Sequence, residues 1–182
     1  MPFRKVFVGK CKNVLPFEIA DAQNVKEEMR LKYRYLDLRN QENKDRIKAF
    51  LITHYHSDVI GALPYVLKDI NVPIYATKLT IGIIENKLQE HNMLRNTRRK
   101  VISYGQSIHL GQLRIEFIKT NHSIQDAAAL AIYSPAGIVV HTGDFKVDYT
   151  PVFGDAIDLQ RFAELGKKGV TLLLSDSTNS ER

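Results

Sequence analysis

The sequence predicts an α/β fold from about residue 42 onward, and three observations carry this prediction. Short apolar runs typical of buried strands alternate with stretches of helical periodicity. Residues 113–117 alternate apolar and polar side chains, as a half-buried strand does. The turn sequence Ser134-Pro135-Ala136-Gly137 separates two further apolar runs. The first forty or so residues follow a different pattern and form a separate segment in this prediction.

The expected elements alternate along the chain. Strands are expected at residues 49–53, 72–76, 113–117, 128–133, 138–141 and 170–174, the last of them buried. Helices are expected at residues 58–67, at residues 79–88 with Leu79, Ile83 and Leu88 on the apolar face, and at residues 158–165 with Asp158 as the cap. In residues 113–117 the alternation places Arg114 and Glu116 on the solvent side of the strand.

The composition excludes several classes of protein. The sequence contains no apolar run long enough for a signal peptide or a membrane span, so a cytoplasmic protein without membrane partners is expected. Cys11 is the single cysteine, which excludes an internal disulfide framework and a cysteine-rich zinc site. The formal net charge of +6 fits a nucleic-acid partner, but it fits a mildly basic domain equally well, so charge alone does not decide.

Residues 1–41 form the separate first segment. After an extended lead and a cap at Asp21 or Asn24, apolar residues recur at helical spacing: Val25, Met29, Tyr33 and Leu36. The pattern predicts a basic amphipathic helix, and an ordinary helix that docks on the protein's own surface is the favoured interpretation of it. The string KNVLPFEIADAQNVKEEMRLKYRYLDLRN, residues 12–40, resembles the entry into the catalytic domain of aspartyl-tRNA synthetases. None of that family's substrate-binding motifs follows, so the resemblance implies no synthetase activity.

A pair of histidines follows the first expected strand, in Thr53-His54-Tyr55-His56-Ser57-Asp58-Val59. Two imidazoles one residue apart, on a turn that leaves a strand, can point at one ion, and imidazole nitrogen is a good zinc ligand. Asp58 could give an oxygen to a neighbouring ion or orient a water molecule. Solvated or capping histidines explain this string alone equally well.

Two further candidate ligands lie where later strands give way to loops. His122 follows the alternating strand, and Asp144 follows the strand expected at residues 138–141. Strand ends are where α/β proteins place their sites, so a shared rim is geometrically plausible. The sequence therefore favours a metal site built from His54, His56, His122 and Asp144.

Four successive strings resemble motifs of ribonuclease J: HYHSDVIGALPYVL, TNHSIQDAAALAI, HTGDFKVDYTP and LLLSDSTN. The resemblance covers about residues 42–182. Ribonuclease J belongs to the β-CASP branch of the metallo-β-lactamase superfamily, whose members act on nucleic acids. The resemblance implies an αββα sandwich, two zinc ions at one rim of the sheets, and an RNA substrate cut internally or from its 5′ end.

The resemblance also implies a role for each site residue. His54, His56 and His122 match the ligands of the first zinc, and Asp144 matches the carboxylate that bridges both ions. Asp58 matches a ligand of the second zinc and is the candidate catalytic residue. Two further residues match supporting positions that do not bind the metal directly: His141 and Asp176. In such a site two metal ions activate water for attack on a phosphodiester.

Three departures from the family pattern lower the expected activity. Val59 stands where the family motif has a second-zinc histidine, and a late histidine of the same site has no counterpart up to Arg182. At most one zinc ion is therefore expected. The synthetase-like segment stands in place of the family's first strands, which predicts an open sheet edge. The expected architecture is a partial metallo-β-lactamase αββα sandwich at residues 42–182 with an N-terminal helical extension at residues 1–41.

The sequence thus predicts a zinc-dependent ribonuclease, impaired in this chain, with RNA as partner. A non-catalytic RNA-binding remnant and a chimeric fragment without function are the alternatives. Oligomers occur in the family, but their surfaces lie mostly outside this sequence.

Overall fold

The computed structural model describes residues 22–32 and 41–178. The chain divides into two compact units, residues 1–47 and 48–182, and each is described by itself. In the first unit a 3₁₀ turn, η1 (Ala22–Asn24), precedes helix α1 (Glu27–Lys32), and α3 (Gln41–Arg46) follows later. The expected helix is confirmed where it is described, with Glu27 and Glu28 in its first turn. The expected cap at Asn24 is wrong, because Asn24 ends the 3₁₀ turn; Asp21, Tyr33 and Leu36 lie outside the described residues.

The second unit contains two sheets. One is a parallel sheet in the order β1-β2-β3: β1 (Phe50–Leu51), β2 (Ile74–Ala76) and β3 (Arg99–Val101). The other has the order β4-β5-β6-β7-β8: β4 (Ser107–Leu110), β5 (Leu113–Lys119), β6 (Ala128–Ser134), β7 (Gly137–His141) and β8 (Leu172–Leu174). Its neighbouring strands are antiparallel except for β7 and β8, which are parallel. The helices of this unit are α4 (Ser57–Ile60), α5 (Leu63–Asp69), α6 (Lys78–Glu90) and α7 (Leu159–Lys168), with a 3₁₀ turn at η2 (Leu94–Asn96).

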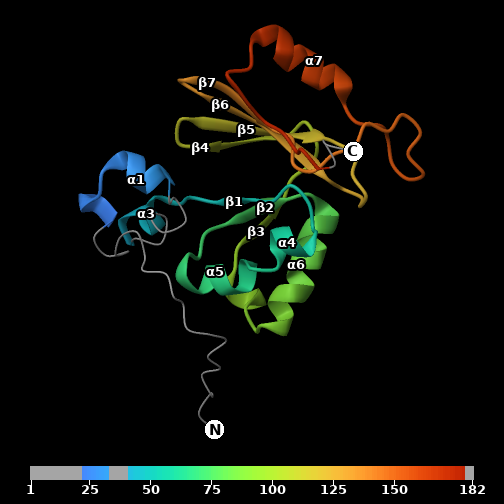
Figure 1. Cartoon of the computed structure of the whole chain (residues 1–182). Coiled ribbons are helices and arrows are strands. Elements are labelled where there is room, and N and C mark those ends of the chain that lie inside the picture. The colour runs from blue at the N-terminus through green and yellow to red at the C-terminus, as the bar shows by residue number, and fades with distance from the viewer. Residues whose placement is uncertain (1–21, 33–40, 179–182) are drawn as a thin grey trace. The chain divides into compact units, whose positions relative to one another are not determined.

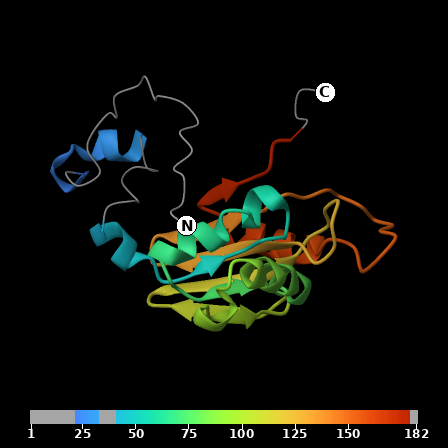
Figure 2. The ribbon, with the colours of Figure 1, turned by 90° about the horizontal axis from the view of Figure 1, so that it is seen from below.

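Three apolar clusters separate four layers of this unit. The first, with Ile60, Leu67 and Ile84 at its centre, lies between α4 to α6 and the three-stranded sheet. The second lies between the two sheets and includes Tyr75, Ile115, Phe117 and Leu130. The third lies between the five-stranded sheet and α7, whose Leu165 is buried in it. Figure 1 shows α7 on the outer side of one sheet and α4 to α6 on the outer side of the other, and in Figure 2 these three helices lie in front of the strands. The predicted αββα sandwich is confirmed for this unit.

Several predicted elements are confirmed with changes. The helix expected at residues 58–67 is interrupted, because α4 ends at Ile60 and α5 begins at Leu63. In α6 the buried apolar face contains Ile81, Ile84 and Leu88, so the expected face with Leu79 is shifted. The hairpin between β6 and β7 and the Asp158 cap of α7 are as predicted; the Asp158 side chain accepts a hydrogen bond from the Arg161 backbone N–H. Strands β3 and β4 have no counterpart in the prediction.

Two expectations about burial are wrong. Glu116 was expected to face solvent, but it is buried at 5% exposure, because α7 covers that face of β5. The last strand was expected to be buried, but Leu172, Leu173 and Leu174 of β8 are all exposed. β8 is the last strand of its sheet and pairs only with β7 among the described residues, so its leucines have little to pack against.

The sheet topology brings three chain segments to one rim. Because β6 runs antiparallel to both β5 and β7, the last residues of β5 and β7 lie at the same edge of the five-stranded sheet. The loops that leave this edge carry His122 and Asp144. The Ala128 backbone N–H, at the start of β6, donates to the Thr53 carbonyl at 2.8 Å. This hydrogen bond holds the segment after β1 at the same rim. No helix among the described residues is long and apolar enough to cross a membrane.

Candidate metal centre

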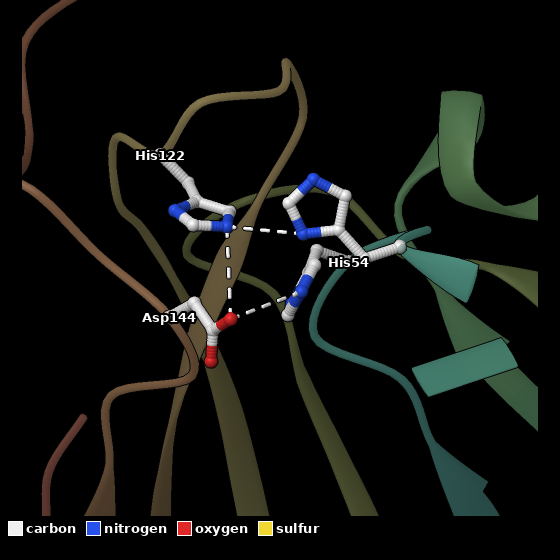
Figure 3. Close-up of side chains that lie close together, drawn as sticks. His54, His122 and Asp144 are labelled. Atoms are coloured by element: carbon white, nitrogen blue, oxygen red, sulfur yellow. Dashed lines mark hydrogen bonds and ion pairs between the residues drawn. The ribbon is translucent and has the colours of Figure 1, made fainter. Parts of the chain in front are cut away.

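Three histidines meet at this rim. His54 follows β1, His56 occupies the N-cap position of α4, and His122 lies in the loop after β5. Their ring centroids are 4.8 to 5.1 Å apart. Figure 3 shows His54 and His122 with their side chains turned toward Asp144. The structure therefore brings together the four residues for which the sequence predicted convergence: His54, His56, His122 and Asp144.

The distances between the candidate ligand atoms are short. His122 Nε2 lies 3.1 Å from His56 Nδ1. Asp144 Oδ2 lies 3.6 Å from His54 Nε2 and 3.7 Å from His122 Nε2. One ligand atom from each of the four residues lies within 4.8 Å of every other. In a tetrahedral zinc site with bonds near 2.0–2.1 Å, neighbouring ligand atoms are about 3.3–3.4 Å apart. The residues present therefore fit a single metal ion.

His54 supplies an independent sign of a missing partner. Its side chain is 1% exposed, and Thr53 Oγ1 lies 2.9 Å from its Nδ1. Its Nε2, the atom that faces Asp144, is buried and has no hydrogen-bond partner among the described residues. A buried polar atom without a partner costs about 1–3 kcal/mol, so such atoms are rare unless a ligand or water completes them. A metal ion at this point would give Nε2 its partner.

The electrostatics keep two of the rings neutral. Burial lowers the pKa of His54 and of His122 below the ordinary histidine value. His56 lowers the pKa of both rings further, and His122 also lowers that of His54, while the Asp144 and Asp58 carboxylates oppose the shift. Only a neutral imidazole has the lone pair that binds a metal ion. The site is therefore prepared for coordination near neutral pH.

The turn that carries Asp144 depends on close packing. Gly143 has a φ of +59°, a left-handed conformation that favours glycine. A Cβ at this position would lie 3.0 Å from the Thr53 Cβ and 3.2 Å from the Ala128 carbonyl oxygen. The Gly143 backbone N–H donates to His141 Nδ1 at 3.0 Å. His141 thus contacts the turn that carries Asp144 and is not a member of the four-residue group.

The other candidate residues lie around the group without joining it. Asp58 is exposed in the first turn of α4, and its charge acts on His54 and His122. Asp176 accepts hydrogen bonds from Thr178 N at 2.8 Å and Thr178 Oγ1 at 2.6 Å, which lower its pKa. Val59 is partly buried and packs against the apolar cluster under α4.

Some residues that build the site were missed by the sequence-based prediction. Thr53 orients His54, and Gly143 allows the close approach of the Asp144 turn. The Thr142 hydroxyl accepts the Asp176 backbone N–H at 3.1 Å and so links the turn to the segment after β8. The only signals in the sequence were a threonine beside the first histidine and a glycine beside the aspartate, both too common to interpret alone.

Two pockets border the group. One, of about 810 Å³, has His122 in its wall. The other, of about 470 Å³, is lined by Asp144 and His141 together with residues after β8, including Asp176. The two walls contain different members of the group, so space for a ligand is available next to both His122 and Asp144.

The sequence matches a known protein family. The family described as "Beta-lactamase superfamily domain" matches residues 28–173. This match includes all four members of the His/Asp group, and it begins within α1, upstream of the junction expected near residue 42.

Several curated proteins are similar to the chain. Ribonuclease J of Synechocystis sp. is 46% identical over 143 residues, which cover 78% of this chain and 22% of that protein. Ribonuclease J 1 of Streptococcus pyogenes is 46% identical over 140 residues, 77% of this chain and 25% of that protein. Ribonuclease J of Helicobacter pylori is 47% identical over 140 residues, 76% of this chain and 20% of that protein. The chain thus spans a quarter or less of the length of these relatives.

Solved structures show a weaker likeness. The metallo-beta-lactamase fold protein YhfI from Bacillus subtilis shares 22% identity with a TM-score of 0.47, over 61% of this chain and 46% of that chain. Zn(2+)-bound PqqB from Methylobacterium extorquens shares 12% identity, also with a TM-score of 0.47, over 54% of this chain and 39% of that chain.

Proposed function

The chain belongs to the β-lactamase superfamily, and from this premise we propose that residues 42–182 are the metal-binding part of a ribonuclease J-like nuclease. The proposed reaction is hydrolysis of phosphodiester bonds in RNA. Identities of 46–47% to proteins named ribonuclease J support it. An RNA substrate would agree with the cytoplasmic location and the basic charge expected from the sequence.

The Nε2 of His54, which is buried without a hydrogen bond and lies 3.6 Å from Asp144 Oδ2, is the observation that carries the proposal. We assign His54, His56, His122 and Asp144 as ligands of one zinc ion. Three imidazole nitrogens and one carboxylate form a donor set that zinc accepts readily. When bound, zinc supplies Lewis acidity at neutral pH for an attack on phosphorus.

The chain's own residues prepare this chemistry. Thr53 fixes the His54 ring so that Nε2 faces the site, and burial keeps the ring neutral. We assign Asp58 the role of accepting a hydrogen bond from the attacking water, because it is exposed and its charge acts on both His54 and His122. His141 and Asp176 support the turn and the strand end around Asp144 without binding the ion.

A single ion is proposed, with correspondingly weak hydrolysis. Val59 occupies the position at which the family resemblance implies a histidine, and its side chain packs against the apolar cluster under α4. With valine at position 59, a second zinc would lose one of the donors that the family pattern provides. A site that held one zinc would supply Lewis acidity from a single ion, so hydrolysis would be slower than with two ions.

Zinc content and RNA cleavage, measured on the same preparation, test the proposal. The purified chain should retain about one zinc after dialysis, by elemental mass spectrometry, and should cut a 5′-labelled single-stranded RNA slowly. His56→Ala and His122→Ala should each lose the metal and the cleavage, while His91→Ala, outside the group, should keep both. Unchanged zinc in the first two variants would sink the ligand assignment. Salt-sensitive RNA binding with a chelator present, but no cleavage with zinc, would favour the non-catalytic alternative.

A further inference from the structure

The larger pocket has a wall in common with the metal centre. Its volume is about 810 Å³, and its walls come from the start of α6, the loop after β5, and the loop between β7 and α7. Figures 1 and 2 show this last loop, in orange, projecting from the body of the second unit. His122 belongs both to the wall and to the four-residue group. A ligand in the pocket would therefore lie next to an ion held by that group.

Two residues in the wall of this pocket have a buried polar atom without a hydrogen-bond partner in the described part of the chain. Thr120 lines the pocket at 4% exposure, and its hydroxyl makes no hydrogen bond to any described residue. Asn121 also lines it; its Nδ2 donates to the Asp155 carbonyl at 3.0 Å, but its buried Oδ1 likewise lacks a partner. Buried polar atoms are paired in the great majority of cases, so these two indicate a ligand with hydrogen-bonding groups.

The rest of the wall carries charges of both signs. Three lysines and three aspartates line the pocket: Lys78, Lys119, Lys146, Asp126, Asp148 and Asp155. Lys119 is paired with Asp155, which is 90% exposed, and Lys146 lies 2.9 Å from Asp148. Each pair has one largely exposed member, and ion pairs that face solvent are weak, so these ammonium groups can exchange a carboxylate for a phosphate. Lys78 is exposed at the start of α6.

Phe153 gives the pocket a surface for stacking. It lines the pocket although its side chain is 72% exposed, so one wall is an aromatic ring open to solvent. Aromatic rings of this kind bind the faces of nucleobases in proteins that hold single strands. A volume of this size is within the range of pockets that hold small molecules.

We propose that this pocket binds one nucleotide of a single-stranded RNA. The base stacks on Phe153, and its polar edge or the ribose hydroxyl bonds to Thr120 and Asn121, since a 2′-hydroxyl can both donate and accept. The phosphate lies against the lysines, with Lys78 at the first turn of α6. That this nucleotide neighbours the cleaved bond rests on the function proposed above.

The test is the affinity of the full chain for a fluorescein-labelled four-nucleotide RNA, by fluorescence anisotropy with a chelator present so that no bond is cut. Phe153→Ala should weaken binding about tenfold, the loss expected for one stacked base. Tyr149→Ala is the matched control, because Tyr149 lies in the same loop and is 73% exposed but does not line the pocket. Lys78→Gln should reduce the salt dependence of binding, while Lys168→Gln, exposed at the end of α7, should not.

Equal affinities of Phe153→Ala and Tyr149→Ala would overturn the pocket assignment. Zinc content separates this result from a failure of the proposed function. A chain that binds zinc and cuts RNA, but in which Phe153→Ala binds RNA like the wild type, would keep the function and lose the pocket. A chain that binds no zinc, but in which RNA binding depends on Phe153, would keep the pocket and lose the nuclease.

Discussion

Arg161 of α7 donates two hydrogen bonds to Glu116 of β5, from Nε at 2.7 Å and from Nη2 at 2.8 Å. The Tyr133 hydroxyl donates a third to Glu116, at 3.0 Å. Burial acts to raise the pKa of Glu116, but the hydrogen bonds from Arg161 and Tyr133 outweigh it, so the pKa is lowered. Helix α7 and strands β5 and β6 of the five-stranded sheet are thus joined through one buried carboxylate.

Arg161→Ala should destabilise the fold strongly. The substitution removes the two guanidinium hydrogen bonds of the buried Glu116 carboxylate and leaves it the more distant Arg114, whose Nη1 lies 3.8 Å away. Breaking a buried ion pair in this way costs about 3–5 kcal/mol. The free energy of unfolding in urea measures it. The double variant Arg161→Ala with Glu116→Gln should lose less, because a neutral amide tolerates burial better than a charge. A loss below about 1 kcal/mol in the single variant would show that solvent reaches Glu116 more freely than its 5% exposure implies.

Glu116 also shows where the periodicity of a sequence stops predicting which residues are buried. Alternation in residues 113–117 correctly predicted β5, with Ile115 and Phe117 facing the other sheet. It could not show that the opposite face is also covered, because the covering helix α7 follows more than forty residues later in the sequence. Glu116 and its partner Arg161 are 45 residues apart. Exposure of β8 was missed for the opposite reason: an apolar run predicts a buried strand only if a neighbour covers it.

The metal centre was more predictable than its surroundings. The sequence placed His54, His122 and Asp144 where strands give way to loops, and each lies three residues after the end of a strand: β1, β5 and β7. The parallel directions of β5 and β7, which bring two of these loops to one rim, are known only from the structure. The contacts of Thr53 and Gly143 depend on packing between segments far apart in the sequence, which no local pattern encodes. Residue type predicted the candidate ligands, and only the fold revealed what holds them.

Thr53→Val should weaken zinc binding about 10- to 100-fold, as loss of a contact behind a metal ligand does. Thr53 Oγ1 lies 2.9 Å from His54 Nδ1, and a proton on Nδ1 shared with this hydroxyl leaves Nε2 free for an ion. Valine has the same shape without the oxygen. Competition with a chromophoric chelator gives the affinity. Thr80→Val, also buried but in α6, is the control and should bind zinc like the wild type.

Gly143→Ala should reduce both stability and zinc affinity. The left-handed conformation alone costs about 1–2 kcal/mol for a residue with a Cβ. Gly111→Ala is the matched control: its φ is +61°, but a Cβ there meets nothing within 4 Å. At Gly143 the Cβ would also press on Thr53 at 3.0 Å and displace the Asp144 turn. Zinc titration and thermal unfolding of both variants check this, and equal zinc affinities would contradict the proposed packing.

Acidification should destabilise the metal-free chain between about pH 7 and pH 5. The folded-state pKa values of His54 and His122 lie below the ordinary value of 6.5, mainly through burial. In this window the unfolded chain therefore binds more protons than the folded chain, and stability falls as the pH falls. Melting temperatures in a chelating buffer measure the effect. The double variant His54→Gln, His122→Gln should show a smaller dependence on pH; an unchanged dependence would assign it to other groups.

Val59→His should raise the zinc content above one ion per chain. Val59 lies one residue after Asp58 in the first turn of α4, and a histidine there adds an imidazole donor beside the Asp58 carboxylate. The valine packs against the apolar cluster under α4, so its loss should also lower stability by about 1–2 kcal/mol. Val59→Asn is the control, because it has a similar packing loss without an imidazole. Elemental mass spectrometry that finds one zinc in both variants would mean that Asp58, Asp144 and a histidine at position 59 cannot together hold a second ion.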